Sequence, residues 1–259
     1  MLKKANTRKI VFGILAVTAF LLLWYFGTNG TRLGNLMPGP VAVFKRLIRS
    51  TYETTGKYTL FGHILTSLSR VMTGFLLAAF LGITLGLAMG WSKSTEAIVK
   101  PLFEIIRPIP PIAWISIAVI WFGLGEGAKY FIIFISGFAN ITINVYTGAR
   151  SVDPELIGAA RMLGCSDRKI FTTIVIPSSI PYIFTGLQIA ISSSWAAVVA
   201  AEMVRSTDGI GWMITSGQGI GDMEQIMVGI IAIGVIGFLL ATIMRGVEAK
   251  LCAWSRVQD

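Results

Sequence analysis

The sequence predicts an all-α, polytopic membrane protein with six transmembrane helices. Of its 259 residues, 54% are hydrophobic and only 14% are charged, whereas about 25% of the residues of an ordinary soluble domain are charged. The mean hydropathy of +0.73 points the same way. A soluble fold of this size would expose large apolar patches, and six separate stretches approach the roughly 20 apolar residues that cross a bilayer.

The six predicted spans follow one another along the whole chain. They are Ile10 to Gly27, Ile64 to Trp91, Pro101 to Leu124, Lys129 to Gly148, Ser179 to Val204, and Ile226 to Gly246. We expect one membrane domain over residues 1–259, in which residues 1–60 hold the first span and a surface helix and residues 61–250 form the core bundle.

The first span has the basic start and apolar middle of a signal peptide. It closes with Trp24, Tyr25 and Phe26, whereas a cleavable signal ends in small residues. Aromatic residues suit the membrane interface, so we expect an uncleaved helix.

The distribution of Lys and Arg predicts the orientation of the spans. Most of these 22 residues lie on the side of the N-terminus if every span crosses the membrane, and cytoplasmic segments are the ones enriched in Lys and Arg. We therefore expect both termini in the cytoplasm. On the opposite side, the segment Val41 to Thr55 places Val41, Phe44, Leu47 and Ile48 at helical spacing, which predicts a helix lying on the membrane surface.

The residues that would support several other functions are few or absent. The net charge of +9 comes without a basic stripe interleaved with aromatics, so we expect no nucleic-acid partner. Cys165, Cys252 and His63 fit no metal-site spacing, and we expect both cysteines to be free thiols in the cytoplasm. No GxxxxGK[ST] motif occurs. We therefore expect a protein that is not an enzyme, without an ATPase site, a metal or a cofactor.

Small residues recur through the second span. Gly74, Ala78, Gly82, Gly86 and Gly90 fall at every fourth position, so they share one face of a helix. Such a face lets two helices approach closely in lipid, where close contact replaces the hydrophobic drive. The pattern predicts helix packing rather than a functional site.

The third span is interrupted by the motif RPIPPIAW, Arg107 to Trp114. Proline lacks a backbone donor and its ring clashes with the preceding turn, so no regular helix runs through these residues. The carbonyl groups that are freed need protein neighbours or a water-lined cavity. Glu104 and Arg107 are three residues apart, a spacing that favours an ion pair.

Polar residues follow one face of the fourth span and one face of the fifth. The fourth span aligns Asn140 and Asn144 with two glycines. The face of the fifth span carries Gln188, Ser192, Trp195, Val199 and Glu202. Such groups are costly at membrane depth unless they face protein or water.

Two interpretations of these faces stay open. Either they form a translocation pathway, built from Asn140, Asn144, Gln188, Ser192 and Trp195, or their hydrogen bonds only hold the helices together. Glu202 lies near the outer end of its span, where we expect it to reach water or to pair with Arg205.

A compact charged segment, GAARMLGCSDRKIFTTIVIP, separates the fourth and fifth spans. Just before it, Asp153 and Pro154 suit the N-cap and first position of a short helix, and Gly164 suits the left-handed turn that ends one. Ser166 then suits the cap of a second helix, which we expect Pro177 to end.

Small residues on the first of these helices suggest a docking surface. We expect Gly158, Ala159 and Ala160 to be exposed, which lets another protein approach the backbone. An ordinary solvated connector is the alternative.

The spacing of this segment resembles the cytoplasmic loop of ABC-importer permeases. That loop reads Glu-Ala-Ala, three residues, Gly, nine residues, then Ile-x-Leu-Pro. Ala159, Ala160 and Gly164 match it, while Gly158 stands in place of Glu and Ile176 in place of Leu. With RPIPPIAWISIAVIWFGLGEG, IPYIFTGLQIAISSSWAAVVAAEM and GIGWMI in the same order, the resemblance is to permeases for nitrate, sulfonate, taurine and bicarbonate, and it covers nearly the whole chain.

The resemblance implies a type I ABC importer permease fold with a cytoplasmic coupling helix, in the bacterial inner (plasma) membrane. Two ATP-binding-cassette ATPase subunits would dock on residues 153–176, at Gly158, Ala159, Ala160, Arg161 and Gly164. A second permease copy, making a homodimer, would complete the pathway. A periplasmic or lipid-anchored binding protein would deliver a small anion, such as a sulfonate or taurine, nitrate or bicarbonate, to outer loops that include Gly209 to Asp222. Closure of the ATPases would drive alternating access.

An ion-coupled secondary transporter or channel is the alternative from a different class, and a membrane enzyme is a third. A secondary transporter keeps ionisable residues near the midplane and often carries an inverted repeat. The central parts of the second, fourth, fifth and sixth spans are almost free of charge, and no such repeat is evident. One histidine with scattered carboxylates does not supply a catalytic cluster.

Overall fold

The computed structural model describes residues 2–252, with side chains for 11–204 and 206–252, and this part is almost entirely helical. The long helices are α1 (Leu2–Thr28), α3 (Leu60–Trp91), α6 (Glu126–Arg150), α9 (Ile176–Arg205) and α11 (Met223–Leu251). The short elements are η1 (Arg32–Asn35), α2 (Pro40–Ser50), α4 (Lys93–Ile106), η2 (Pro111–Trp114), α5 (Ile115–Phe122), α7 (Pro154–Met162), α8 (Asp167–Ile170), the π-helical turn η3 (Phe171–Val175) and α10 (Ile210–Ile220).

The predicted number of spans is confirmed for the described residues. Five helices are long and apolar enough to cross a membrane, and the count reaches six if α4 and the η2–α5 segment form one bent span. The two parts of that span meet at an angle of 89°. The break falls on Arg107 to Pro110, where the proline motif predicted that no regular helix could continue.

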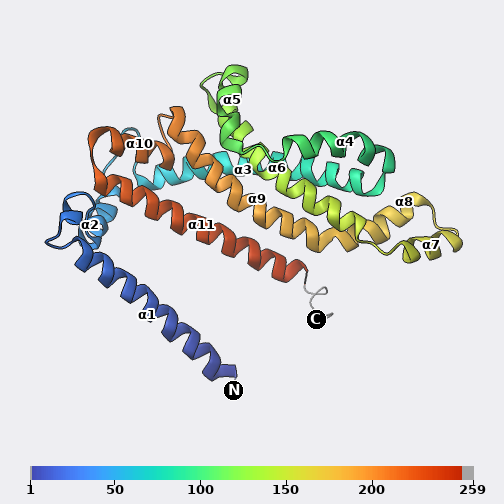
Figure 1. The fold of residues 1–259 in the computed structure, drawn as a ribbon, viewed down its shortest axis with the longest axis horizontal. Helices are drawn as coiled ribbons and strands as arrows, with labels where there is room; N and C mark the ends of the chain where they lie inside the picture. The colour runs from blue at the N-terminus through green and yellow to red at the C-terminus, as the bar shows by residue number, and fades with distance from the viewer. Residues whose placement is uncertain (1, 253–259) are drawn as a thin grey trace.

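The core lies along α6, which packs against α3 on one side and α9 on the other. Side chains from these helices are buried together, among them Val71, Ala78, Ile133, Ile141 and Val198. In Figure 1, α3, α6, α9 and α11 run along the long axis of the molecule. Apolar side chains at helical spacing thus meet between helices, while other large ones, such as Phe80 at 70% exposed, face outward where lipid lies.

The small-residue face of α3 packs directly on α6, as its spacing predicted. A β-carbon placed on Gly86 would lie 2.7 Å from the Val145 Cβ and 2.8 Å from the Thr142 carbonyl oxygen. One placed on Gly82 would lie 3.0 Å from the Ile141 Cβ. Only glycine allows so close an approach, so this face fixes how the two helices cross.

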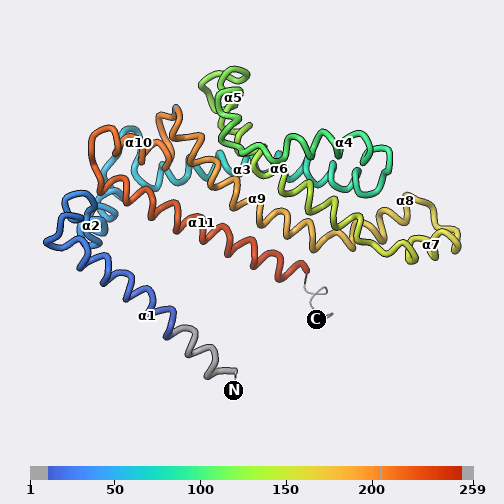
Figure 2. Tube along the Cα trace, viewed as in Figure 1, coloured from blue at the N-terminus to red at the C-terminus, as the bar shows by residue number. Residues whose placement is uncertain are grey.

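Helix α1 stands apart from the bundle (Figures 1 and 2). Its large apolar side chains are exposed, with Phe12 at 69% and Leu23 at 74%. One link to the chain that follows is a hydrogen bond of 3.2 Å from the Trp24 indole N–H to the Pro38 carbonyl. A helix that is apolar all round belongs in lipid or against another subunit.

Helices α7 and α8 lie at one end of the long axis, and α2 and α10 lie at the other (Figure 2). The end that carries α2 and α10 is held together by apolar and ionic contacts. On α2, Val43 is buried while Val41, Phe44 and Ile48 are exposed, and the Arg46 guanidinium binds the Asp222 carboxylate at 2.9 Å. A helix is therefore present in the predicted segment and is tied to the start of α11; its position on the membrane surface stays a prediction.

Two sequence predictions about these ends are wrong. Residues Gly209 to Asp222 are not a loop, because Ile210 to Ile220 form α10, which buries Ile210 and Met213 against the bundle. Pro177 does not end a helix either. It lies in the first turn of α9, directly after the wider π-helical turn η3, which joins α8 to α9 without a break.

Candidate functional site

The α7–α8 segment is built as its sequence predicts. The Asp153 carboxylate accepts a hydrogen bond from the Glu155 backbone N–H at 2.8 Å and caps α7. Gly164 has a φ of +79°, the left-handed conformation that ends α7. The Ser166 hydroxyl then accepts from the Lys169 N–H at 3.4 Å at the start of α8. The result is a short helix, a sharp turn and a second helix.

The side chains that α7 exposes differ from those predicted. Ala159 is exposed and Gly158 half-buried, but Ala160 is buried at 9% exposure, so the expectation that all three are exposed is wrong for Ala160. At this point the chain folds back onto α7, because the Ala160 backbone carbonyl accepts from the Cys165 N–H at 3.0 Å.

Two large apolar side chains dominate the exposed surface of the turn. Met162 is 86% exposed and Leu163 84% exposed, next to exposed Gly164. Sequence reasoning passed over both because it looked for small residues. Arg161 lies beside them and pairs with Asp167 at 3.1 Å, with both side chains largely in solvent. Exposed pairs of this kind contribute about 1 kcal/mol or less, so Arg161 stays available to a partner.

Asn140 joins the polar faces of α6 and α9. Its amide nitrogen donates to the Ser136 carbonyl at 2.9 Å and to the Ser193 hydroxyl at 3.1 Å. The bond to Ser193 joins α6 to α9, which is the kind of contact that the packing interpretation of these faces expects. The Asn144 amide instead donates to the Asn140 carbonyl of its own helix at 2.8 Å.

The other predicted pathway residues lie between α9 and α11. The Gln188 amide donates to the Glu248 carboxylate of α11. Ser192 is exposed and, with Gln188, lines an open hollow of about 590 Å³. Trp195 is not part of this hollow, because it is buried at 4% exposure and donates its indole N–H to the Ile233 carbonyl at 3.0 Å. A pathway through these residues stays a prediction.

A buried ionic cluster lies at the opposite end from α7, and sequence reasoning missed it. The Arg70 guanidinium binds the Glu126 carboxylate at 2.7 Å and the Glu202 carboxylate at 2.8 Å, and it also pairs with Asp208. Lys129 adds a second cation, 2.8 Å from Glu126. Arg70 is 3% exposed and Glu202 is fully buried. The cluster therefore connects α3, α6 and α9 with the turn before α10.

The expectation that Glu202 reaches water is wrong, because its side chain is fully buried. Its carboxylate accepts from the Ser67 hydroxyl at 2.8 Å and from the Gly211 backbone N–H at 2.9 Å, besides Arg70. The Arg205 side chain lies outside the described residues. The signal that could have found this site was present, since Arg70 and Glu202 are ionisable residues within predicted spans, where each requires a partner.

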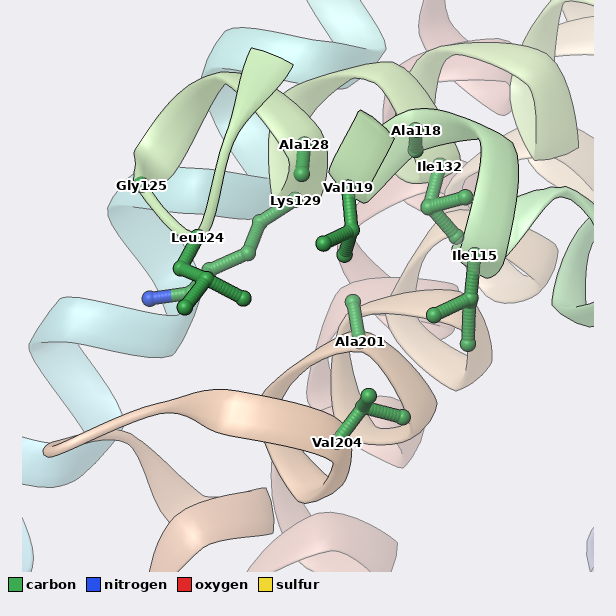
Figure 3. A pocket seen from close by; sticks show the side chains of 10 residues that line it. All are labelled: Ile115, Ala118, Val119, Leu124, Gly125, Ala128, Lys129, Ile132, Ala201 and Val204. Atoms are coloured by element: carbon green, nitrogen blue, oxygen red, sulfur yellow. The ribbon is translucent and has the colours of Figure 1, made fainter. Parts of the chain in front are cut away.

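Helix α5 packs against α6 and α9 beside the ionic cluster, and the contact includes Ala118, Ala128 and Ala201. A cavity of about 20 Å³, enough for about one water molecule, lies between α5, α6 and α9. Figure 3 shows Ile115, Ala118 and Val119 of α5 above Ala201 and Val204 of α9. The Lys129 nitrogen extends past Leu124 away from these apolar side chains (Figure 3). The bent span is thus packed on the bundle.

This architecture defines the class of the protein, a multi-pass α-helical membrane protein with a capped helix–turn–helix exposed at one end. Residues 78–251 match the family described as "Binding-protein-dependent transport system inner membrane component". The chain belongs to this family, so it is a permease of the ABC importers.

Relatives with described functions cover most of the chain. A probable ABC transporter permease of Brucella melitensis is 36% identical over 89% of this chain and 92% of its own length. The taurine transport system permease TauC of Escherichia coli is 32% identical over 96% and 91%. The bicarbonate transport system permease CmpB of Synechococcus elongatus is 36% identical over 89% and 85%. The predicted resemblance to this group of permeases is confirmed.

Two solved structures share the fold. The MetNI methionine ABC transporter, described as inward facing, aligns with a TM-score of 0.57 at 18% identity over 70% of this chain and 92% of that chain. An amino acid ABC transporter with histidines aligns with a TM-score of 0.62 at 16% identity over 81% and 96%. These likenesses confirm the predicted type I importer permease fold.

Proposed function

We propose that this chain is one of two permease copies in an ABC importer, and that separate ATPase subunits dock on residues 153–176 and drive alternating access. Both termini and the α7–α8 segment face the cytoplasm. Residues 1–259 form a single membrane domain, and its core bundle lies in residues 61–250. The basic residues of the α7–α8 segment, Arg161, Arg168 and Lys169, support this orientation.

The observation that carries the proposal is the exposure of Met162 and Leu163 at the turn after α7. Two large apolar side chains in solvent at the end of a capped helix have no stabilising role within the chain. Inserted in a groove on a partner, each would stabilise the complex by about 1.5–3 kcal/mol through burial of its apolar surface. Gly158 and Ala159 beside them let the partner approach the helix backbone, and Gly164 allows the tight turn.

The translocation pathway of the proposed importer follows the polar side chains between the helices. Asn140 and Ser193 lie at the contact of α6 and α9, and Gln188 and Ser192 line the hollow beside α11. A second copy of the chain would close these surfaces into a shared path, since two-fold pairing is the commonest oligomer symmetry. Asn144 and Trp195 complete the proposed set.

The proposed substrate is a small anion that a periplasmic or lipid-anchored binding protein delivers to the end that carries α2 and α10. Taurine and bicarbonate permeases are among the relatives, and a nitrate import permease is another, 34% identical over 93% of this chain. These names support sulfonates, nitrate or bicarbonate as candidates.

A capture experiment tests the docking proposal. The full chain carrying Met162→Glu and Leu163→Glu is co-expressed with the ATP-binding-cassette protein encoded nearest to its gene, and the retained ATPase is measured. We expect at least a tenfold loss, because a buried charge opposes docking. The control is Leu33→Glu with Leu36→Glu, two exposed apolar residues of the segment before α2, near the opposite end. Equal retention by both variants would contradict the proposal.

A further inference from the structure

A cavity of about 460 Å³ lies where the bent span meets α6 and α9. Its wall includes Arg107, Pro110 and Trp114 from the break, Phe134 and Asn140 from α6, and Ser193 from α9. The volume falls in the range of pockets that hold small organic ligands, about 300–1,000 Å³. Asn140 lies 14 residues into the 25-residue helix α6, so the cavity is near the middle of the spans.

The charged group in this wall is Arg107. Among the described residues, no carboxylate lies within ion-pair distance of the Arg107 guanidinium, so the predicted pair with Glu104 is wrong. Glu104 lies on a different hollow of α4, beside Lys93 and Lys100. Arg107 is exposed at the break and lines the cavity, so its guanidinium is open to an anion that enters.

The rest of the wall is aromatic. The Phe134 and Phe138 rings stack at 5.1 Å between centroids, and Phe103 meets Phe138 edge-on at 6.3 Å. Trp114 packs edge-on against Phe131 at 6.4 Å, and its buried indole N–H has no hydrogen-bond partner in the described structure. A buried donor without an acceptor calls for an explanation, and a ligand oxygen in the cavity provides one.

We infer that this cavity is a substrate site for organic anions, in which Arg107 binds a sulfonate or carboxylate group and the aromatic wall holds an apolar body. The inference rests on the proposed transport function and names the substrate class within it. A guanidinium offers five N–H donors in a planar fork that matches such oxyanions. Nitrate or bicarbonate would fill little of 460 Å³ and would leave the Phe134 and Phe138 faces without a ligand.

Equilibrium binding to the full chain in lipid nanodiscs tests the inference, with benzenesulfonate as the probe and calorimetry as the readout. We expect saturable binding that Arg107→Gln weakens at least tenfold and Arg107→Lys weakens less. The matched control is Arg32→Gln, which removes an exposed guanidinium far from this wall and leaves the affinity unchanged.

Two further probes keep the test decisive if Arg107→Gln fails to fold. The wild-type chain should bind benzenesulfonamide, the neutral analogue, and nitrate, the anion without an apolar body, each at least tenfold more weakly than benzenesulfonate. No binding of benzenesulfonate, equal binding of either analogue, or an unchanged affinity in Arg107→Gln overturns the inference. Retention of the ATPase by Arg107→Gln shows that docking, the basis of the proposed function, is intact in the same protein.

Discussion

At the scale of the residue, the structure shows why single charges within the spans are informative. Arg70 and Glu202 come from spans that are otherwise apolar, and each is satisfied by the other together with Ser67, Glu126 and Asp208. Arg107 has no such partner among the described residues. The first arrangement stabilises the fold, and the second is the basis of the anion site that we propose.

Removal of the Arg70 charge tests the stabilising role of the outer cluster. Arg70→Met leaves the buried Glu202 carboxylate uncompensated, which costs about 3–5 kcal/mol. The matched control is Arg161→Met, whose pair with Asp167 lies largely in solvent, so the loss there is about 1 kcal/mol or less. Thermal melting of the detergent-solubilised protein, followed by size-exclusion chromatography, measures both. Equal shifts of the melting temperature would show that the cluster adds no stability.

At the scale of the element, local chemistry predicted helix ends well. The Asp153 cap, the left-handed Gly164 and the Ser166 cap are all present, because each depends only on residues a few positions away. The same local reasoning failed at Pro177, since a proline in a first helical turn and one after a last turn look alike in sequence. It also missed α10, whose Ile210 and Met213 are helical because of what they pack against.

The close contact of α3 and α6 makes a second prediction. Gly86→Leu places its side chain against Val145 and the Thr142 carbonyl, and overpacking of this kind typically costs about 1–3 kcal/mol. Gly234→Leu is the control, because Gly234 lies on an exposed face of α11 with no atom within 4 Å of an added β-carbon. The yield of monodisperse protein should fall for the first variant only. If both variants behave like the wild type, glycine is not required at this contact.

At the scale of the whole molecule, the sequence predicted the number and order of the spans but not their arrangement. Composition alone reveals apolar helices of membrane-spanning length. Packing between distant segments decides the 89° bend, the cavity beside it and the position of α1 apart from the bundle. Of the candidate site, the turn geometry of α7 was predictable, whereas the exposure of Met162 and Leu163 and the burial of Ala160 were not, because both follow from how the turn folds back.

The central claim is that an ATPase subunit binds the turn after α7. Site-specific cross-linking in membranes tests this claim most directly. The two native cysteines are first removed with Cys165→Ser and Cys252→Ser, and the chain is co-expressed with its ATPase and treated with a short bis-maleimide. We expect Leu163→Cys to cross-link to a cysteine in the ATPase, and Thr207→Cys, exposed at the opposite end, to give no cross-link. Capture of the ATPase at residue 207 but not at residue 163 would contradict the account.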